Sequence, residues 1–198
     1  MDDAVWAGVD DQRSRVVALL ESLTPGEWES PSLCTGWRVR DVAAHLTLQQ
    51  VTLGQALVLF LRTPGGVNHV IQRSAVRKAS RVTSDDLIAE IRSTIGSRRT
   101  NVGIPPVGAL SDIVLHGQDI AVPLGHRIQV DAEIAMAVLD FLWALLAAGK
   151  AGVYAPSPRE GVRFVAVDAD WAAGEGAAAH APALSIAMIL TGRSIGLG

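Results

Sequence analysis

The sequence predicts a mainly α protein, a helical bundle followed by a small C-terminal α+β addition. Apolar residues recur at helical spacing up to about residue 148, and the tail after residue 160 changes to the alternating period of strands. The length of 198 residues allows one sizeable core and a small appendage. We therefore expect a bundle over residues 1–150 and an extension over residues 151–198, which is too short to fold alone and should pack on the bundle.

Composition and charge exclude several classes of protein. The net charge of -3 argues against a nucleic-acid partner or a membrane surface, because phosphate groups attract an excess of basic residues. The single cysteine, Cys34, cannot close an intrachain disulfide or form a paired-cysteine zinc site. The N-terminus lacks the pattern of a signal peptide. These features predict a cytoplasmic protein, either a monomer or a homodimer, with no nucleic-acid partner and no membrane association.

The first three predicted helical segments lie before residue 62. Apolar residues form a stripe over residues 3–23, which predicts a helix. Thr24 and Glu27 have the spacing of a capping box with proline at the first helical position, which predicts a short helical turn. From Val39 the apolar pattern runs to Leu61 and predicts one helix of about 24 residues that stops at Thr63-Pro64-Gly65-Gly66.

The middle and the end of the chain are predicted in the same way. Residues 64–82, which carry several basic and no acidic residues, are predicted to be a loop with some helical character. Helices are predicted from the Thr83-Ser84-Asp85-Asp86 start to Ile95, over residues 107–122 and over residues 131–148. The tail predicts a strand near residues 162–167, a polar turn with a return strand, and a short helix over residues 182–190.

The predicted helix near residues 132–149 is apolar enough to raise the question of a membrane span. It contains Glu133 and Asp140, and a carboxylate near the middle of a bilayer is costly. A buried helix of a soluble protein is therefore the better interpretation.

Four polar residues on two predicted helices could form a metal site. Asp112, His116 and Asp119 are spaced i, i+4 and i+7, so they share one helical face, and His45 lies on the helix that begins at Val39. A carboxylate and an imidazole about 6 Å apart along a helix can converge on one ion with a ligand from a facing helix. Two histidines and one carboxylate leave open positions for water or substrate. Spacing alone favours the plainer alternative of a hydrogen-bonded histidine and a surface ion pair.

Two segments resemble a known family. The first runs from Trp28 to Leu46 and has fixed positions for Trp28, Pro31, Ser32, Cys34, Gly36, Trp37, Val39, Arg40, Asp41, Val42, Ala44, His45 and Leu46. It resembles the N-terminal signature of the mycothiol-dependent maleylpyruvate isomerase family, a branch of the DinB-like superfamily. The segment from Asp112 to Gly125 is similar to the second signature of that family, and the tail with Trp171 and Gly192-Arg193 is similar to its C-terminal region.

The resemblance implies a fold and a chemistry. It implies a DinB-like up-down four-helix bundle with an additional helix, and a divalent metal, usually zinc, held by His45, Asp112 and His116. It also implies mycothiol as a thiol cosubstrate, bound at the metal as a thiolate. Because a thiolate is the nucleophilic form of a thiol, the implied function is addition to a small electrophilic substrate, either as an S-transferase or as a thiol-assisted cis-trans isomerase.

The sequence departs from the family pattern at two positions. Asp112 stands where the family has glutamate, and its side chain is shorter by about 1.5 Å. A metal–carboxylate bond of about 2.2 Å then requires a closer helix or a bridging water. Arg38 stands at the helix start where the family favours serine or threonine, although Asp41 still suits the helix dipole. The first departure leaves open a second function, a non-catalytic DinB-like protein that binds a small molecule or a thiol and has lost the metal.

Other polar residues have weaker claims to a role. Gln49 lies one turn after His45 and could contact the bound cosubstrate, with a surface position as the alternative. Asp119 is expected either to orient a metal ligand or to bond the end of its helix. Arg193 is a candidate for binding a carboxylated substrate, with a solvated charge as the alternative. Cys34 has no clear partner base and is expected to be structural, and Trp28 and Trp37 are expected to lie in the core.

Overall fold

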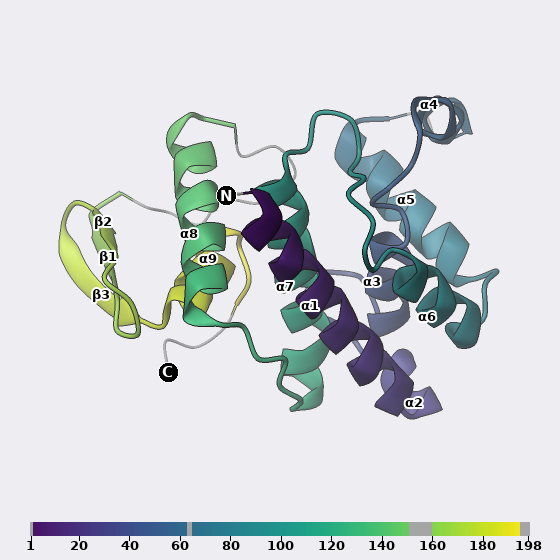
Figure 1. Ribbon diagram of the computed structural model, residues 1–198, viewed down its shortest axis with the longest axis horizontal. Helices are drawn as coiled ribbons and strands as arrows, with labels where there is room; N and C mark the ends of the chain where they lie inside the picture. Colours follow the sequence, from purple (N-terminus) through teal and green to yellow (C-terminus); the bar gives the residue numbers. More distant parts are fainter. Residues whose placement is uncertain (1, 63–64, 151–159, 195–198) are drawn as a thin grey trace. The chain divides into compact units, whose positions relative to one another are not determined.

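The computed structural model describes residues 2–62, 65–150 and 160–194. The described chain is mainly helical, with a small three-stranded sheet toward the C-terminus, which confirms the predicted fold class (Figure 1). The chain divides into two compact units, Met1–Gln129 and Val130–Gly198. The sequence places the boundary at residue 150 instead, and the two divisions differ because helix α8 packs against the C-terminal helix α9.

The regular elements in the described part of the N-terminal unit are helices, apart from an isolated β-bridge between Pro31 and Arg38. Its elements are α1 (Asp2–Ser22), α2 (Pro25–Trp28), α3 (Val39–Leu46), α4 (Leu53–Arg62), α5 (Val67–Ala79), α6 (Ser84–Ser93), α7 (Pro106–Ala121) and the 3-10 turn η1 (Val122–Leu124). Helix α1 packs along α7, while α3 contacts α5, α6 and α7 (Figure 1). Helix α3 therefore lies among three other helices, and the side chains at its C-terminal end face neighbours rather than bulk water.

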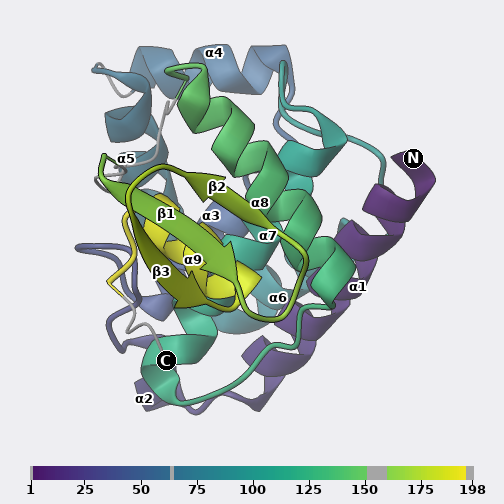
Figure 2. The same cartoon turned by 90° about the vertical axis from the view of Figure 1, so that its left-hand side faces the viewer.

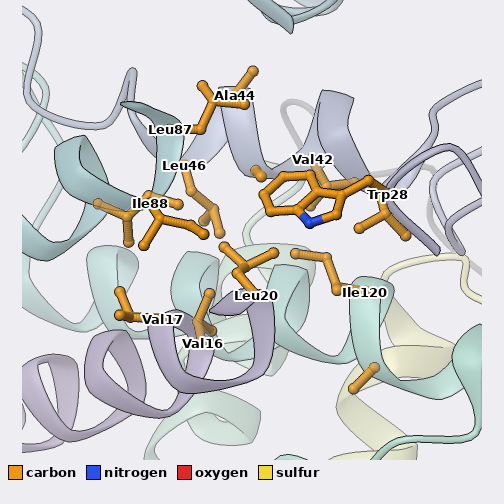
Figure 3. Close-up of a cluster of buried hydrophobic side chains, with 14 of the residues drawn as sticks. Val16, Val17, Leu20, Trp28, Val42, Ala44, Leu46, Leu87, Ile88 and Ile120 are labelled. Carbon is orange, nitrogen blue, oxygen red and sulfur yellow. The ribbon is translucent and has the colours of Figure 1, made fainter. Parts of the chain in front are cut away.

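The core of this unit is formed by helices α1, α3, α6 and α7. Leu20, Val42 and Leu87 are almost completely buried there, and the indole of Trp28 closes one end of the cluster (Figure 3). The prediction that Trp28 is a core residue is confirmed. Burial of a leucine or valine side chain stabilises the fold by about 1.5–3 kcal/mol. Packing of these side chains therefore holds α3 and α7 at a fixed separation.

The predicted capping box at the start of α2 is confirmed. The Thr24 hydroxyl accepts a hydrogen bond from the Glu27 amide (3.4 Å), and a Glu27 carboxylate oxygen accepts one from the Thr24 amide (2.8 Å). His126 reaches the other carboxylate oxygen at 3.0 Å. One acidic side chain thus connects the turn after α1 with the segment after α7.

The prediction of one long helix from Val39 to Leu61 is wrong. Helix α3 ends at Leu46, and α4 begins at Leu53 after a turn. The side-chain amide of Asn101 stabilises this turn. Its oxygen accepts a hydrogen bond from the Val51 amide (2.9 Å), and its nitrogen donates one to the Leu48 carbonyl (3.1 Å). The Thr52 and Gln55 side chains then cap each other's amides at the start of α4. The predicted stop at Thr63 and Pro64 lies outside the described residues.

Residues 64–82, predicted as a loop with some helical character, are more helical than predicted, because residues 67–79 form helix α5. This helix buries Val70, Ser74, Ala75 and Ala79, and it packs against α3. The buried stripe consists mostly of small residues, so hydrophobic periodicity is weak while the packing against α3 is close. The helix starts predicted at Thr83 and at Pro105-Pro106 are confirmed, and the Thr83 hydroxyl accepts from the Asp86 amide at 3.2 Å.

The C-terminal unit consists of α8 (Ala132–Ala147), β1 (Val162–Ala166), β2 (Ala172–Gly174), β3 (Ala177–Ala181) and α9 (Ala183–Leu190). Strand β1 is central, antiparallel to β2 and parallel to β3, and one face of the sheet lies against α9 (Figure 2). The Trp171 indole donates to Asp140 on α8 at 2.8 Å. The helices at 131–148 and 182–190 and the return strand are confirmed as predicted, and β3 is an addition to that prediction.

None of the described helices combines the length and the hydrophobicity that crossing a bilayer requires. Helix α8, the most apolar long segment of the sequence, has Asp140 paired with an indole rather than facing lipid.

The capping box leads to a prediction about pH. Hydrogen bonds from the Thr24 amide and hydroxyl, and then from His126, lower the pKa of Glu27 to about 2. A carboxyl group with a lowered pKa adds stability above its unfolded pKa of about 4.3, and that stability is lost as the pH falls toward the folded value. We expect Glu27→Gln to unfold more easily than the wild type at pH 7, with a difference that shrinks between about pH 4.5 and 2. Urea unfolding at several pH values measures this. A difference that is constant with pH would contradict the prediction, since glutamine keeps the capping geometry without the charge.

Candidate metal centre

Helices α3 and α7 bring His45, Asp112 and His116 together. One Asp112 carboxylate oxygen, Oδ1, lies 3.7 Å from His45 Nε2 and 3.5 Å from His116 Nε2. The two imidazole rings meet edge to face with centroids 4.7 Å apart. Ligand atoms of all three residues lie within 4.8 Å of one another. The i, i+4 pair on α7 and the histidine on α3 therefore converge on one point.

The shorter carboxylate at position 112 reaches both histidines directly. Two ligand atoms bound to a tetrahedral zinc ion at about 2.0–2.1 Å lie about 3.3–3.4 Å apart. The two separations from Asp112 Oδ1, 3.5 and 3.7 Å, are close to this value. The Asp112 side chain is 30% exposed, whereas those of His45 and His116 are 15% and 13% exposed. The cluster is therefore open to a ligand mainly from the side of Asp112.

Electrostatics in the cluster favour a cation. Burial disfavours the charged form of Asp112, but the charge of His116 and the contacts with His116 and His45 outweigh it, so the pKa of Asp112 lies well below its usual range. Burial likewise opposes protonation of His116, but Asp112, and then Asp119 and Cys34, raise the pKa of His116 well above its usual value. The Asp112 carboxylate is therefore held as an anion between two imidazoles. Protonated His116 supplies the positive charge that a bound metal ion would otherwise supply.

Asp119 orients the second histidine. It is completely buried, and its Oδ2 accepts a hydrogen bond from His116 Nδ1 at 2.8 Å. With the Nδ1 proton held by Asp119, release of the Nε2 proton would leave the lone pair of Nε2 directed at Asp112 and His45, which is the arrangement that metal-binding histidines adopt. Of the two roles expected for Asp119, its contacts therefore match orientation of a ligand.

Two residues that the sequence assigned to structural roles lie against the cluster. Cys34 donates its thiol proton to Asp119 Oδ2 at 3.0 Å, and its sulfur lies 3.7 Å from His116 Nδ1. Trp37 is only partly buried, and its ring centroid lies 5.4 Å from that of His45 and 6.4 Å from that of His116. Both residues have fixed positions in the segment before α3 that resembles the family signature. Their contacts with α7 depend on the fold, because the sequence does not show that this loop lies against that helix.

The remaining predicted site residues are not connected to the cluster by the described contacts. Gln49 lies in the turn after α3, and its buried Nε2 has no hydrogen-bond partner among the described residues. Arg193 follows α9 in the C-terminal unit, where its side chain donates to the Thr191 carbonyl at 3.3 Å. The roles of Gln49 in cosubstrate binding and of Arg193 in catalysis stay predictions.

The helical unit and its buried histidine pair define a class, a helical-bundle protein with a candidate three-ligand metal centre. Comparison with protein families specifies this class further. Residues 9–106, just under half of the chain, match the mycothiol maleylpyruvate isomerase N-terminal domain. The match includes His45 and ends before Asp112 and His116. No curated protein and no solved structure matches the chain in the corresponding comparisons.

The contacts of His116 lead to a prediction about its protonation. Because Asp112 raises the pKa of His116 more strongly than Asp119 does, we expect Asp112→Asn to bring that pKa down further than Asp119→Asn. Titration of the imidazole nitrogen signals by NMR, in protein kept metal-free with a chelator, measures both shifts. Asp85→Asn, which changes an α6 carboxylate that is not among the causes of the raised His116 pKa, provides the control. A larger shift for Asp119→Asn would contradict the prediction.

Proposed function

We propose that the protein is a metal-dependent, mycothiol-using enzyme that acts on a small electrophilic substrate by thiolate addition, as an S-transferase or a thiol-assisted cis-trans isomerase. The observation that carries the proposal is the position of Asp112 Oδ1, 3.5 and 3.7 Å from the Nε2 atoms of His116 and His45. The match of residues 9–106 to the mycothiol maleylpyruvate isomerase N-terminal domain supports the choice of thiol.

The metal in this proposal is a divalent ion, with zinc as the first choice. His45, Asp112 and His116 would hold it, because two imidazoles and a carboxylate are a common ligand set of catalytic zinc and leave a position for an exogenous ligand. When bound there, the ion lowers the pKa of a coordinated thiol and supplies the thiolate nucleophile at neutral pH. The Asp112 carboxylate oxygen and the two imidazole nitrogens lie within 4.8 Å of one another, so the donor set fits such an ion.

The side chains of this protein would then bind and orient the reactants. Asp119 holds the Nδ1 proton of His116 and fixes its tautomer. Gln49 supplies an amide Nε2 that has no partner among the described residues and is proposed to donate to the bound thiol or substrate. Arg193 is proposed to bind a carboxylate of the substrate. Trp37 covers the two imidazoles and limits the access of water to them.

The proposed reaction balances without any further reactant. The mycothiol thiol loses its proton on binding, and the thiolate sulfur forms a bond to an electron-poor carbon of the substrate. In transfer, either the bond from that carbon to a leaving group breaks and the leaving group takes up the proton released by the thiol, or the electron pair of the attacked double bond moves to the neighbouring carbon, which takes up that proton. In isomerisation, the electron pair of the double bond moves onto the conjugated acceptor, rotation follows about the resulting single bond, and expulsion of the thiolate restores the double bond.

The metal is tested first. We expect the purified wild type to contain about one divalent ion per chain and His45→Ala and His116→Ala to contain almost none, because each variant removes one of three protein ligands. His126→Ala is the matched control, since His126 pairs with Glu27 instead. Elemental analysis measures the content. A wild-type protein that binds no zinc, and whose thermal stability is the same with and without chelator, would contradict the proposal and favour the non-catalytic alternative.

The thiol chemistry is tested separately on the metal-loaded protein. We expect consumption of mycothiol, or isomerisation catalysed by it, with small unsaturated carboxylic acids as candidate electrophiles. Activity should fall by at least 10-fold in Asp119→Asn, since loss of such an outer partner typically costs 10–100-fold in metal affinity or activity. Thiol titration and absorbance of the unsaturated substrate follow the reaction. Binding of mycothiol that is unchanged by zinc removal, without turnover of any candidate, would instead indicate a thiol-binding protein.

A further inference from the structure

The loop before α3 has a well-defined local structure around the only cysteine of the chain. The Ser32 hydroxyl accepts a hydrogen bond from the Cys34 amide (3.1 Å) and donates to the Trp37 carbonyl (3.0 Å). The Trp37 amide donates to the Cys34 carbonyl at 2.9 Å. Gly36 adopts a φ of 77°, which favours glycine. Ser32 therefore closes the loop on itself and fixes where the Cys34 side chain points.

Two hydrogen bonds connect this loop to Asp119 on α7. The Leu33 amide donates to the Asp119 carbonyl at 3.1 Å, and the Cys34 thiol donates to Asp119 Oδ2 at 3.0 Å. Two consecutive loop residues thus bind the main chain and the side chain of the same aspartate. The bond to the main chain sets the distance between loop and helix, which leaves the thiol in reach of the carboxylate.

Cys34 and His116 share one carboxylate oxygen. His116 Nδ1 lies 2.8 Å from Asp119 Oδ2, and the Cys34 sulfur lies 3.0 Å from the same atom. Because the carboxylate is completely buried, protein donors replace the water that would solvate it on the surface. Rotation of the carboxylate away from His116 would break the thiol bond as well, so the thiol restrains the acceptor on which the orientation of His116 depends.

We infer that Cys34 is a positioning residue, whose thiol fixes Asp119 and through it the ring and tautomer of His116 for metal binding. The inference rests on the proposed function, because it presumes that His116 is a ligand. The thiol acts here as a hydrogen-bond donor to a carboxylate, and its sulfur takes no part in bond formation with the substrate. The opposing explanation is packing, because Cys34 also contacts the hydrophobic core of the N-terminal unit.

Two substitutions separate donation from packing. Cys34→Ser keeps a donor and is more polar, whereas Cys34→Val keeps an apolar side chain and has no donor. Zinc affinity is measured for both by competition with a chromophoric chelator, and the ligand geometry is followed by the visible spectrum of the Co²⁺-loaded protein. Circular dichroism and the thermal midpoint show whether each variant is folded.

If Cys34 positions Asp119, Cys34→Val weakens zinc binding by about 10-fold, the lower end of the range for partners outside the ligand set, and alters the Co²⁺ spectrum. Cys34→Ser then stays within about 3-fold of the wild type, because its hydroxyl still donates. The reverse order of affinities indicates packing and overturns the inference, as do two variants that both match the wild type or both fall equally.

A separate measurement distinguishes failure of the inference from failure of the proposed function. A wild type that binds neither zinc nor Co²⁺ would overturn the proposed function. In the metal-free protein, solvent exchange of the His116 Nδ1 proton, measured by NMR, reports on Asp119 directly. We expect slow exchange in the wild type and in Cys34→Ser, and exchange at least several-fold faster in Cys34→Val. Equal rates in the three proteins would overturn the positioning role whatever the metal does.

Discussion

The buried carboxylate of Asp119 is the interaction on which the candidate centre depends. An anion without access to water is tolerated when protein donors surround it, and Asp119 receives donors from α7 itself and from the loop before α3. Those two donors belong to segments more than 80 positions apart in the sequence. The need to satisfy one charge therefore determines how the loop lies against α7, and with it the relation between the start of α3 and the face of α7 that carries Asp112 and His116.

Elements with local determinants were predictable from the sequence. The capping box of Thr24 and Glu27, the start of α6 at Thr83 and the start of α7 after Pro105 each depend on residues within one turn of the boundary. The i, i+4 pair of Asp112 and His116 is local in the same sense, because a helix alone places the two side chains on one face. The position of His45 opposite them came from the resemblance to a family, since no local signal fixes how two helices face each other.

The errors arose where distant residues or small side chains decide the structure. The apolar pattern continues from α3 into α4, but the side chain of Asn101, about 50 positions further along the chain, binds the turn that separates the two helices. Helix α5 buries serine and alanine, which have little weight in a hydrophobic pattern but allow close packing. Strand β3 is almost entirely alanine, which is depleted in strands, and it exists because β1 offers a parallel partner. The contacts of Cys34 are equally distant in the sequence, since its partners Asp119 and His116 lie on α7.

The division of the chain into two compact units bears on how such a protein diversifies. The three residues proposed to hold the metal, and the residues that orient and cover them, all belong to the unit Met1–Gln129. The recognised family segment ends before two of the three, so the donor set needs the helix that follows this segment. The unit Val130–Gly198, with its sheet and α9, contributes none of these donors. Sequence drift in that unit can therefore proceed without altering the ligand set, and a change there would act on the proposed substrate contact of Arg193 instead.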